Sequence, residues 1–154
     1  MTSRTLIFLA AGGSFALLAG AFLFQALGWQ PCAMCLWQRW PHAAAIFLGG
    51  LAFLVPSAFV AILGAAAAAT TSGIGLYHSG VERDWWEGPA SCTSAGGGLD
   101  GLSGSDLLSI DGPALVLCDQ FTPFFLGMSM ANWNAILSVF LAAIWISAAL
   151  KSRA

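Results

Sequence analysis

The first long apolar stretch of the chain, TLIFLAAGGSFALLAGAFLFQAL at residues 5–27, decides the fold. It runs for about 20 residues without a charge, which is the length that an α-helix needs to cross the hydrocarbon core of a bilayer. A signal peptide also has an apolar core after a basic residue, here Arg4, but that core is shorter, and no convincing A-x-A cleavage site follows. We therefore predict a retained transmembrane helix.

Three further apolar blocks of similar length lie at residues 36–55, 57–77 and 131–150. The composition agrees, because 58% of the residues are hydrophobic and 8% are charged, whereas an ordinary soluble domain carries about 25% charged residues. Many of the apolar residues are Ala and Gly, which let membrane helices approach closely. The sequence predicts an all-α membrane protein, in which residues 1–154 form a single domain with a four-helix transmembrane bundle.

The basic residues predict how this bundle is oriented. Lys and Arg near the ends of spans favour the cytoplasmic side, and Arg4, Lys151 and Arg153 lie at the two termini, which four spans place together. Arg39 and Arg83 would lie on the opposite side, so the excess of basic residues on the cytoplasmic side is small. We expect both termini to be cytoplasmic.

This orientation places two loops on the outer side, at residues 28–35 and 78–130. The two loops contain all four cysteines of the chain: Cys32, Cys35, Cys92 and Cys118. Cysteines confined to the non-cytosolic face are typical of a compartment in which disulfides persist.

The first pair forms a Cys-x-x-Cys unit, Cys32 and Cys35, within GWQPCAMCLWQRWPH at residues 28–42. Such a unit can be a redox dithiol, half of a metal site or a structural disulfide. If a helix begins by Cys35, Arg39 lies one turn further on the same face and favours the thiolate, which is the attacking species. In the alternatives, Pro41 is the first helical residue and leaves Cys35 in the loop, or Arg39 is only an anchor to lipid headgroups.

The second pair, Cys92 and Cys118, flanks the Gly- and Ser-rich stretch SAGGGLDGLSGSD at residues 94–106, which we expect to be mobile. The spacing is unlike the repeated pairs of a zinc site, although a metal could still draw on the four sulfurs or on His42 and His78. One disulfide in each loop would place two bridges on the same face of the membrane, where oxidising equivalents pass between them through a mixed disulfide.

A dithiol that is oxidised repeatedly needs an electron acceptor. The sequence has no nucleotide-binding glycine motif and no haem-attachment motif. A lipid-soluble quinone, reached from within the bilayer, is the economical interpretation, although composition and spacing do not identify quinone by themselves.

These residues resemble a known family. The segment Cys32-Ala-Met-Cys35-Leu-Trp-Gln-Arg39, the stretch YHSGVERDWWEGPASC that ends at Cys92, and Cys118 followed by FFLGMSMANWN are similar to the disulfide bond formation protein B (DsbB) family of bacterial inner-membrane thiol oxidases. The likeness extends from about the first span to the last. It rests on four spans, one cysteine pair in each outer loop, and an arginine four places after the first pair.

The resemblance implies a multi-pass protein-disulfide:quinone oxidoreductase of the bacterial inner membrane, with its cysteine loops in the periplasm. It implies a Cys92–Cys118 disulfide that a reduced periplasmic thioredoxin-like (DsbA-like) partner attacks through Cys92. Cys118 then engages Cys32, and Cys35 is released as a thiolate facing a bound ubiquinone or menaquinone. Because the Cys92–Cys118 bridge must react with a partner, we expect it to be the strained or exposed one.

The resemblance also implies two quinone-binding residues, Arg39 and His78, and it implies no metal ligands. Gln38 stands where some relatives carry an acid, so the local charge balance differs. We expect His42 to lie at the membrane interface.

Two other functions stay open on the sequence. In the first, the protein binds or transports a soft metal such as Cu(I), through thiols and thioethers: Cys32, Cys35, Met34, Met128 and Met130. In the second, it is a structural protein with four spans and two inert disulfides.

Overall fold

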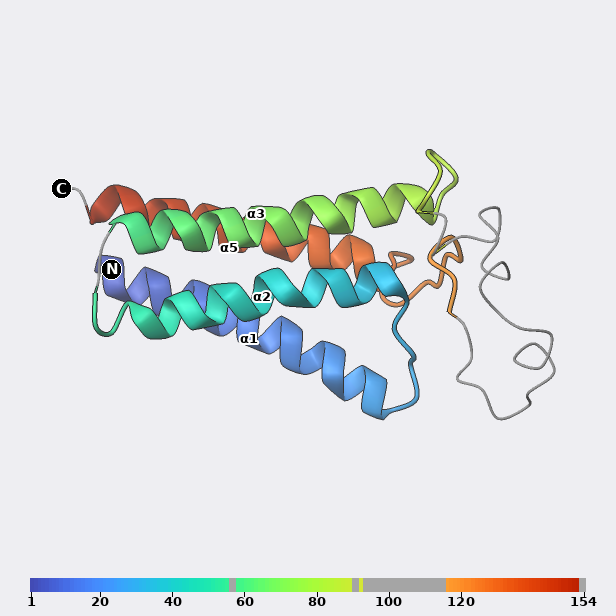
Figure 1. Cartoon of the computed structure of the whole chain (residues 1–154), viewed down its shortest axis with the longest axis horizontal. Helices are drawn as coiled ribbons and strands as arrows, with labels where there is room; N and C mark the ends of the chain where they lie inside the picture. Colours follow the sequence, from blue (N-terminus) through green and yellow to red (C-terminus); the bar gives the residue numbers. More distant parts are fainter. Residues whose placement is uncertain (56–57, 90–91, 93–115, 153–154) are drawn as a thin grey trace.

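The computed structural model describes residues 1–55, 58–89, 92 and 116–152, and they form the all-α bundle that the sequence predicts (Figure 1). Its helices are α1 (Ser3–Ala26), α2 (Ala33–Leu51), α3 (Ala58–Val81) and α5 (Met130–Lys151). Both chain termini lie at one end of the bundle, and the cysteine-bearing connections lie at the other (Figure 1). We call the half next to Met1 and Ser152 the terminal half, and the half next to Cys32 and Cys118 the cysteine half. The stretch 94–106 lies outside the described residues.

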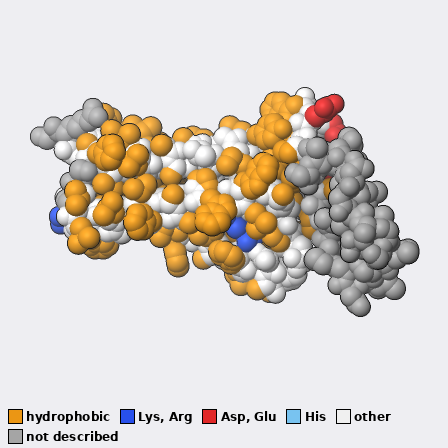
Figure 2. Space-filling view, in the orientation of Figure 1, with side chains coloured by type: hydrophobic (Ala, Val, Ile, Leu, Met, Phe, Trp, Pro, Cys, Tyr) orange, Lys and Arg blue, Asp and Glu red, His pale blue; other side chains and the backbone are white. Residues whose placement is uncertain are grey.

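Three helices, α1, α3 and α5, are long and apolar enough to cross a membrane. Helix α2 was predicted as a fourth span at 36–55, but its composition alone does not mark it as one, because Gln38, Arg39 and His42 shorten its apolar part. It nevertheless lies beside the other helices and packs against α1 and α3 (Figure 1). Figure 2 shows apolar side chains over much of the bundle surface, as expected for helices that face lipid.

The predicted ends of the second and third blocks are wrong by a few residues. Helix α2 begins at Ala33 rather than at residue 36, because the Cys32 side chain caps it and accepts a hydrogen bond from the Cys35 amide. It ends at Leu51 rather than at residue 55. Helix α3 runs to Val81 rather than to residue 77, because its last turn is buried in the cysteine half instead of lying in the loop. The outer loops are correspondingly shorter.

The terminal half has an apolar core, in which small and aliphatic side chains surround Trp145, which is fully buried. Gly64 of α3 lies directly against the Trp145 ring, and a Cβ added there would be 2.5 Å from the ring. Gly49 of α2 lies equally close to Ala11 of α1. Small residues thus let these helices approach closely, as the composition predicts.

Helix α1 belongs to this core only over its first half. Its buried residues all lie between Leu6 and Ser14, whereas α3 and α5 have buried residues along their whole length. Beyond Ser14 the helix diverges from the bundle (Figure 1). The divergence leaves room for a cavity in the cysteine half.

Candidate thiol–disulfide site and its cavity

The Cys-x-x-Cys unit lies at the start of α2. Cys32 is the N-cap residue, and its Sγ lies 3.3 Å from the Cys35 amide nitrogen and 3.0 Å from the Cys35 Sγ. Both residues are free cysteines in this structure. Pro41 lies inside the helix and does not start it, so Cys35 and Arg39 are one turn apart on the same helix. The alternative in which Pro41 starts the helix and Cys35 lies in the loop is therefore wrong.

The two thiols differ in acidity. A hydrogen bond from the Cys32 thiol to the Cys35 sulfur raises the pKa of Cys32, and burial raises it further. The same hydrogen bond lowers the pKa of Cys35; burial opposes this change, and a backbone hydrogen bond and the Arg39 charge add smaller lowering effects. Both residues lie in the first turn of α2, outside its apolar part. Cys35 is therefore the better thiolate of the pair.

The second pair forms a disulfide between Cys92 and Cys118, with the two Cα atoms 5.2 Å apart. A backbone hydrogen bond also links the Cys118 amide to the Cys92 carbonyl oxygen. We expected this bridge to be the strained or exposed one, and it is not exposed, since the two residues are only 2% and 1% exposed. They pack against Cys32, Met34 and Val81 in one cluster of the cysteine half.

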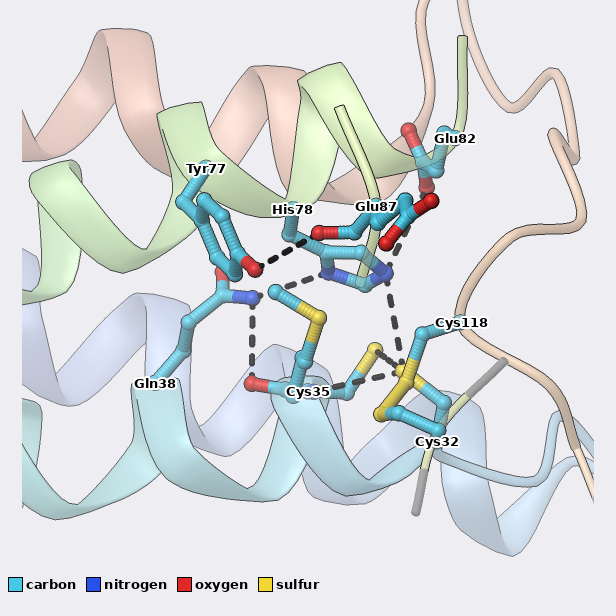
Figure 3. The surroundings of a disulfide bond; sticks show 10 residues. Cys32, Cys35, Gln38, Tyr77, His78, Glu82, Glu87 and Cys118 are labelled. Carbon is cyan, nitrogen blue, oxygen red and sulfur yellow. Dashed lines mark hydrogen bonds and ion pairs between the residues drawn. A yellow bond between two sulfur atoms is a disulfide. The ribbon is translucent and has the colours of Figure 1, made fainter. Parts of the chain in front are cut away.

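The fold brings the two cysteine pairs together. The Sγ atoms of Cys32 and Cys118 and a ring nitrogen of His78 all lie within 4.8 Å of one another (Figure 3). Such a trio could hold a soft metal, but the Cys118 sulfur is already bonded to Cys92, so only two of the three groups are free donors in this redox state. The arrangement suits thiol–disulfide exchange across the two loops.

His78, at the outer end of α3, lies between this cluster and Gln38 (Figure 3). Gln38 donates from Nε2 to His78 Nδ1, over 3.1 Å, and to the Met34 carbonyl oxygen. With Nδ1 accepting, a neutral imidazole carries its hydrogen on Nε2, which faces the Cys32 Sγ at 3.6 Å and Glu82 Oε1 at 3.8 Å. His78 therefore contacts a sulfur as well as lining the cavity.

Glu82 follows α3 and closes this side of the site. Its carboxylate accepts a hydrogen bond from Ser129, the N-cap residue of α5. Burial raises the pKa of Glu82, and the Ser129 hydrogen bond opposes that rise. Glu82 thus ties the end of α3 to the start of α5 beside His78.

Arg39 lies half-buried against α1 and not in the loops. Its Nη1 donates to Gln25 Oε1 at 2.6 Å, and its guanidinium carbon lies 4.8 Å from the centre of the Phe22 ring. Its Nε is buried and has no hydrogen-bond partner among the described residues. Arg39 is also one of the residues that line the cavity.

The cavity has a volume of about 600 Å³ and lies between the diverging half of α1 and the other helices. Its wall is mainly apolar, but polar residues also line it, among them Cys32, Cys35, Gln38, Arg39, His42, His78 and Asn134. A largely apolar cavity with a few convergent polar groups is typical of a site for a small organic ligand. The orphaned Arg39 Nε and the apolar wall fit a flat ring with polar oxygens, such as a quinone.

His42 lies in surroundings that we did not predict from the sequence. We expected this residue at the membrane interface, but it is 3% exposed, and its Nε2 lies 2.8 Å from Asn134 Oδ1. Asn134 in turn donates to Gln38 Oε1 and to Thr71 Oγ1. Polar residues inside otherwise apolar blocks were the available signal, because such residues in membrane helices need partners within the bundle.

An all-α membrane bundle with a dithiol beside a disulfide, at the mouth of an apolar cavity, defines a membrane thiol–disulfide protein. The family profile described as "Disulfide bond formation protein DsbB" matches residues 3–148. The chain belongs to this family, and it is a membrane protein of disulfide bond formation.

Two relatives share this description. The chain is 26% identical, over 148 residues, to "Disulfide bond formation protein B" of Polaromonas sp. (strain JS666 / ATCC BAA-500). The aligned region covers 92% of this chain and 87% of the relative. It is 28% identical, over 140 residues, to the protein of the same name from Polaromonas naphthalenivorans (strain CJ2), with 86% and 83% covered. No solved structure matches the chain.

Proposed function

We propose that this protein oxidises a periplasmic thioredoxin-like (DsbA-like) dithiol protein and passes the electrons, through its two cysteine pairs, to a membrane quinone. The observation that carries the proposal is the position of Cys32. Its sulfur lies within 4.8 Å of Cys118 and 3.0 Å from the Cys35 Sγ, so it is next to both the loop disulfide and the cavity thiol.

The relay begins at the loop disulfide. A thiolate of the partner attacks the Cys92 sulfur, a mixed disulfide forms, and Cys118 leaves as a thiolate. When the first pair is oxidised, Cys118 attacks Cys32, the Cys32–Cys35 bond breaks, and Cys35 leaves as a thiolate. The second thiol of the partner then displaces Cys92 as a thiolate. Cys92 attacks the Cys118 sulfur, the Cys32–Cys118 bond breaks, Cys32 leaves as a thiolate, and the loop disulfide is restored.

At the end of this sequence the partner is oxidised, and Cys32 and Cys35 hold two electrons and two protons. A quinone supplies the oxidising power, because it takes up two electrons and two protons as the pair returns to a disulfide. For a two-electron exchange, about 30 mV of potential difference corresponds to roughly 1.4 kcal/mol.

The residues around the first pair have separate tasks in this proposal. The lowered pKa of Cys35 provides the thiolate that faces the cavity. Arg39 binds a quinone oxygen through its unpartnered Nε. His78 donates its Nε2 hydrogen toward the Cys32 sulfur, which favours the thiolate of Cys32 when that residue leaves or attacks.

Burial of the loop disulfide places a requirement on the partner. Cys92 and Cys118 are almost fully covered, so the chain around them must open before a partner thiolate can reach the Cys92 sulfur. Binding of the partner is the event that we expect to expose it. In this proposal the loops are periplasmic, the termini are cytoplasmic, and the protein lies in the bacterial inner membrane.

The test is a turnover measurement with purified protein, a reduced thioredoxin-like dithiol protein and a soluble quinone analogue, in which loss of quinone absorbance is followed. We expect turnover by the wild type and none by Cys35→Ser. The matched control is Ser147→Ala, which changes an exposed residue that bonds only to its own helix and should turn over normally. Undiminished turnover in Cys35→Ser, or none in the wild type, would contradict the proposal.

A further inference from the structure

A second polar group lies deeper in the cavity wall. His42 of α2 and Asn134 of α5 both line the cavity and are joined by a hydrogen bond of 2.8 Å. His42 is two turns beyond Cys35, which is about 10 Å further along the helix axis. The proposed function gives no task to either residue.

The hydrogen bonds around Asn134 fix the tautomer of His42. The Asn134 amide nitrogen donates to Gln38 Oε1 at 2.7 Å and to Thr71 Oγ1 at 3.1 Å. The Asn134 Oδ1 must therefore be the acceptor toward His42, whose Nε2 carries the hydrogen. In a neutral imidazole the other nitrogen, Nδ1, is then an acceptor with a free lone pair. It is buried and has no hydrogen-bond partner in the part of the chain that the structure describes.

This acceptor lies on the same side of α2 as the thiol. Cys35, Arg39 and His42 occupy positions i, i+4 and i+7, which share one helix face, and all three line the cavity. The Cα–Cβ bonds of a helix tilt toward its N-terminus, which is the end of α2 that carries Cys35. A ring ligand that extends inward from Cys35 along this face approaches His42.

An acceptor distinguishes the two redox forms of such a ligand. An oxidised quinone has carbonyl oxygens that only accept hydrogen bonds, whereas a hydroquinone has hydroxyl groups that donate. We propose that His42, oriented by Asn134, is a hydroquinone-binding residue, whose Nδ1 accepts a hydrogen bond from a hydroxyl group of the product. This inference rests on the proposed function, because it needs a quinone in the same cavity.

The direct test is equilibrium binding without turnover. A short-chain ubiquinone analogue and its hydroquinone are titrated separately into Cys35→Ser protein, and binding is followed by quenching of tryptophan fluorescence, since Trp29 and Trp133 line the cavity. His42→Leu, added to this background, removes the hydrogen bond from the ligand hydroxyl to Nδ1, and this loss should weaken hydroquinone binding about tenfold. The Kd of the oxidised analogue should change less than about twofold, because it makes no bond to Nδ1.

Two further variants separate binding from a structural role. His42→Gln can donate to Asn134 and still offer an oxygen acceptor, so it should keep the preference for hydroquinone. Ser72→Ala removes another buried hydrogen bond to α5, from Ser72 Oγ to the Ala135 carbonyl oxygen, at a residue that does not line the cavity, and it should change neither Kd.

The outcomes are distinguishable from those of the proposed function. Equal weakening of both redox forms in His42→Leu, or no change in either, would overturn the role of His42 and leave quinone turnover untouched. If wild-type protein and the Cys35→Ser background bind neither form, the proposed function fails, and this inference fails with it. If His42→Leu does not fold, the result for His42→Gln decides, and loss of the hydroquinone preference there would overturn the inference.

Discussion

The terminal half and the cysteine half of the bundle are built from the same helices but packed in opposite ways. In the terminal half, α1 is buried from Leu6 to Ser14, and glycines bring backbones against Ala11 and Trp145. In the cysteine half, α1 diverges (Figure 1), a cavity of about 600 Å³ opens, and polar side chains of α2, α3 and α5 line part of its wall. Tight packing at one end thus lets the other end hold a cavity and a reactive site without loss of the bundle.

The largest expected effect concerns the terminal half. Gly64→Leu would force a side chain into the Trp145 ring, since even a Cβ would lie 2.5 Å from it, and overpacking of this kind costs about 3 kcal/mol or prevents folding. Gly73→Leu on the same helix is the control, because a Cβ there meets nothing within 4 Å. Unfolding in dodecyl sulfate, followed by circular dichroism, should separate the two variants. Equal stability would show that the terminal half is not tightly packed.

The next effect concerns the cysteine half and should leave stability nearly unchanged. Arg39→Met removes a charged donor from the cavity wall, and hydrogen bonds to charged groups contribute about 1.5–3 kcal/mol, so the KM for the quinone analogue should rise about tenfold or more. Arg83→Met is the control, since Arg83 bonds to Ser79 and Asn132 and does not line the cavity. A similar KM increase in both variants would contradict a specific role for Arg39.

The smallest expected effect is a shift in the pH dependence of Cys35 alkylation. Because the pKa of Cys35 is lowered, its thiolate persists at a lower pH than that of an ordinary thiol, and its alkylation by iodoacetamide should begin at a lower pH. Cys32→Ala removes the hydrogen-bond donor beside the Cys35 sulfur, so the pKa of Cys35 should rise and the alkylation profile should move to higher pH. The profiles are measured by mass spectrometry on the reduced protein. Identical profiles would mean that Cys32 does not control Cys35.

The sequence predicted the bundle well because long apolar blocks have few alternatives in a membrane. The ends of α1 and α5 agree with prediction within two residues, since apolar length alone defines them. The start of α2 was missed, because it depends on a cap by the Cys32 side chain, and propensity assigns no such role to cysteine. Pro41 also left the start of α2 open, because a proline is common at the first helical position. An interior proline is tolerated in a membrane helix where the surrounding helices support the chain.

The site was predicted less completely than the fold. The Cys-x-x-Cys spacing and the i+4 arginine are local patterns, so Cys32, Cys35 and Arg39 could be selected without a structure. The contact of His42 with Asn134 joins residues that are far apart in the sequence, and only the arrangement of the helices in the bundle reveals it. Burial of the Cys92–Cys118 bridge likewise depends on its packing against residues from distant parts of the chain, Cys32, Met34 and Val81.

The most direct test of the relay across the two loops uses the double variant Cys35→Ser, Cys92→Ser, which leaves only Cys32 and Cys118. Their sulfurs lie within 4.8 Å of each other, so mild oxidation of the purified protein should join them in an intramolecular disulfide, detected by mass spectrometry of unreduced peptides. Cys32→Ser, Cys92→Ser, which leaves Cys35 and Cys118, should form its bond more slowly and incompletely. Free thiols in the first variant, or equal yields in both, would contradict a relay that passes from Cys118 to Cys32.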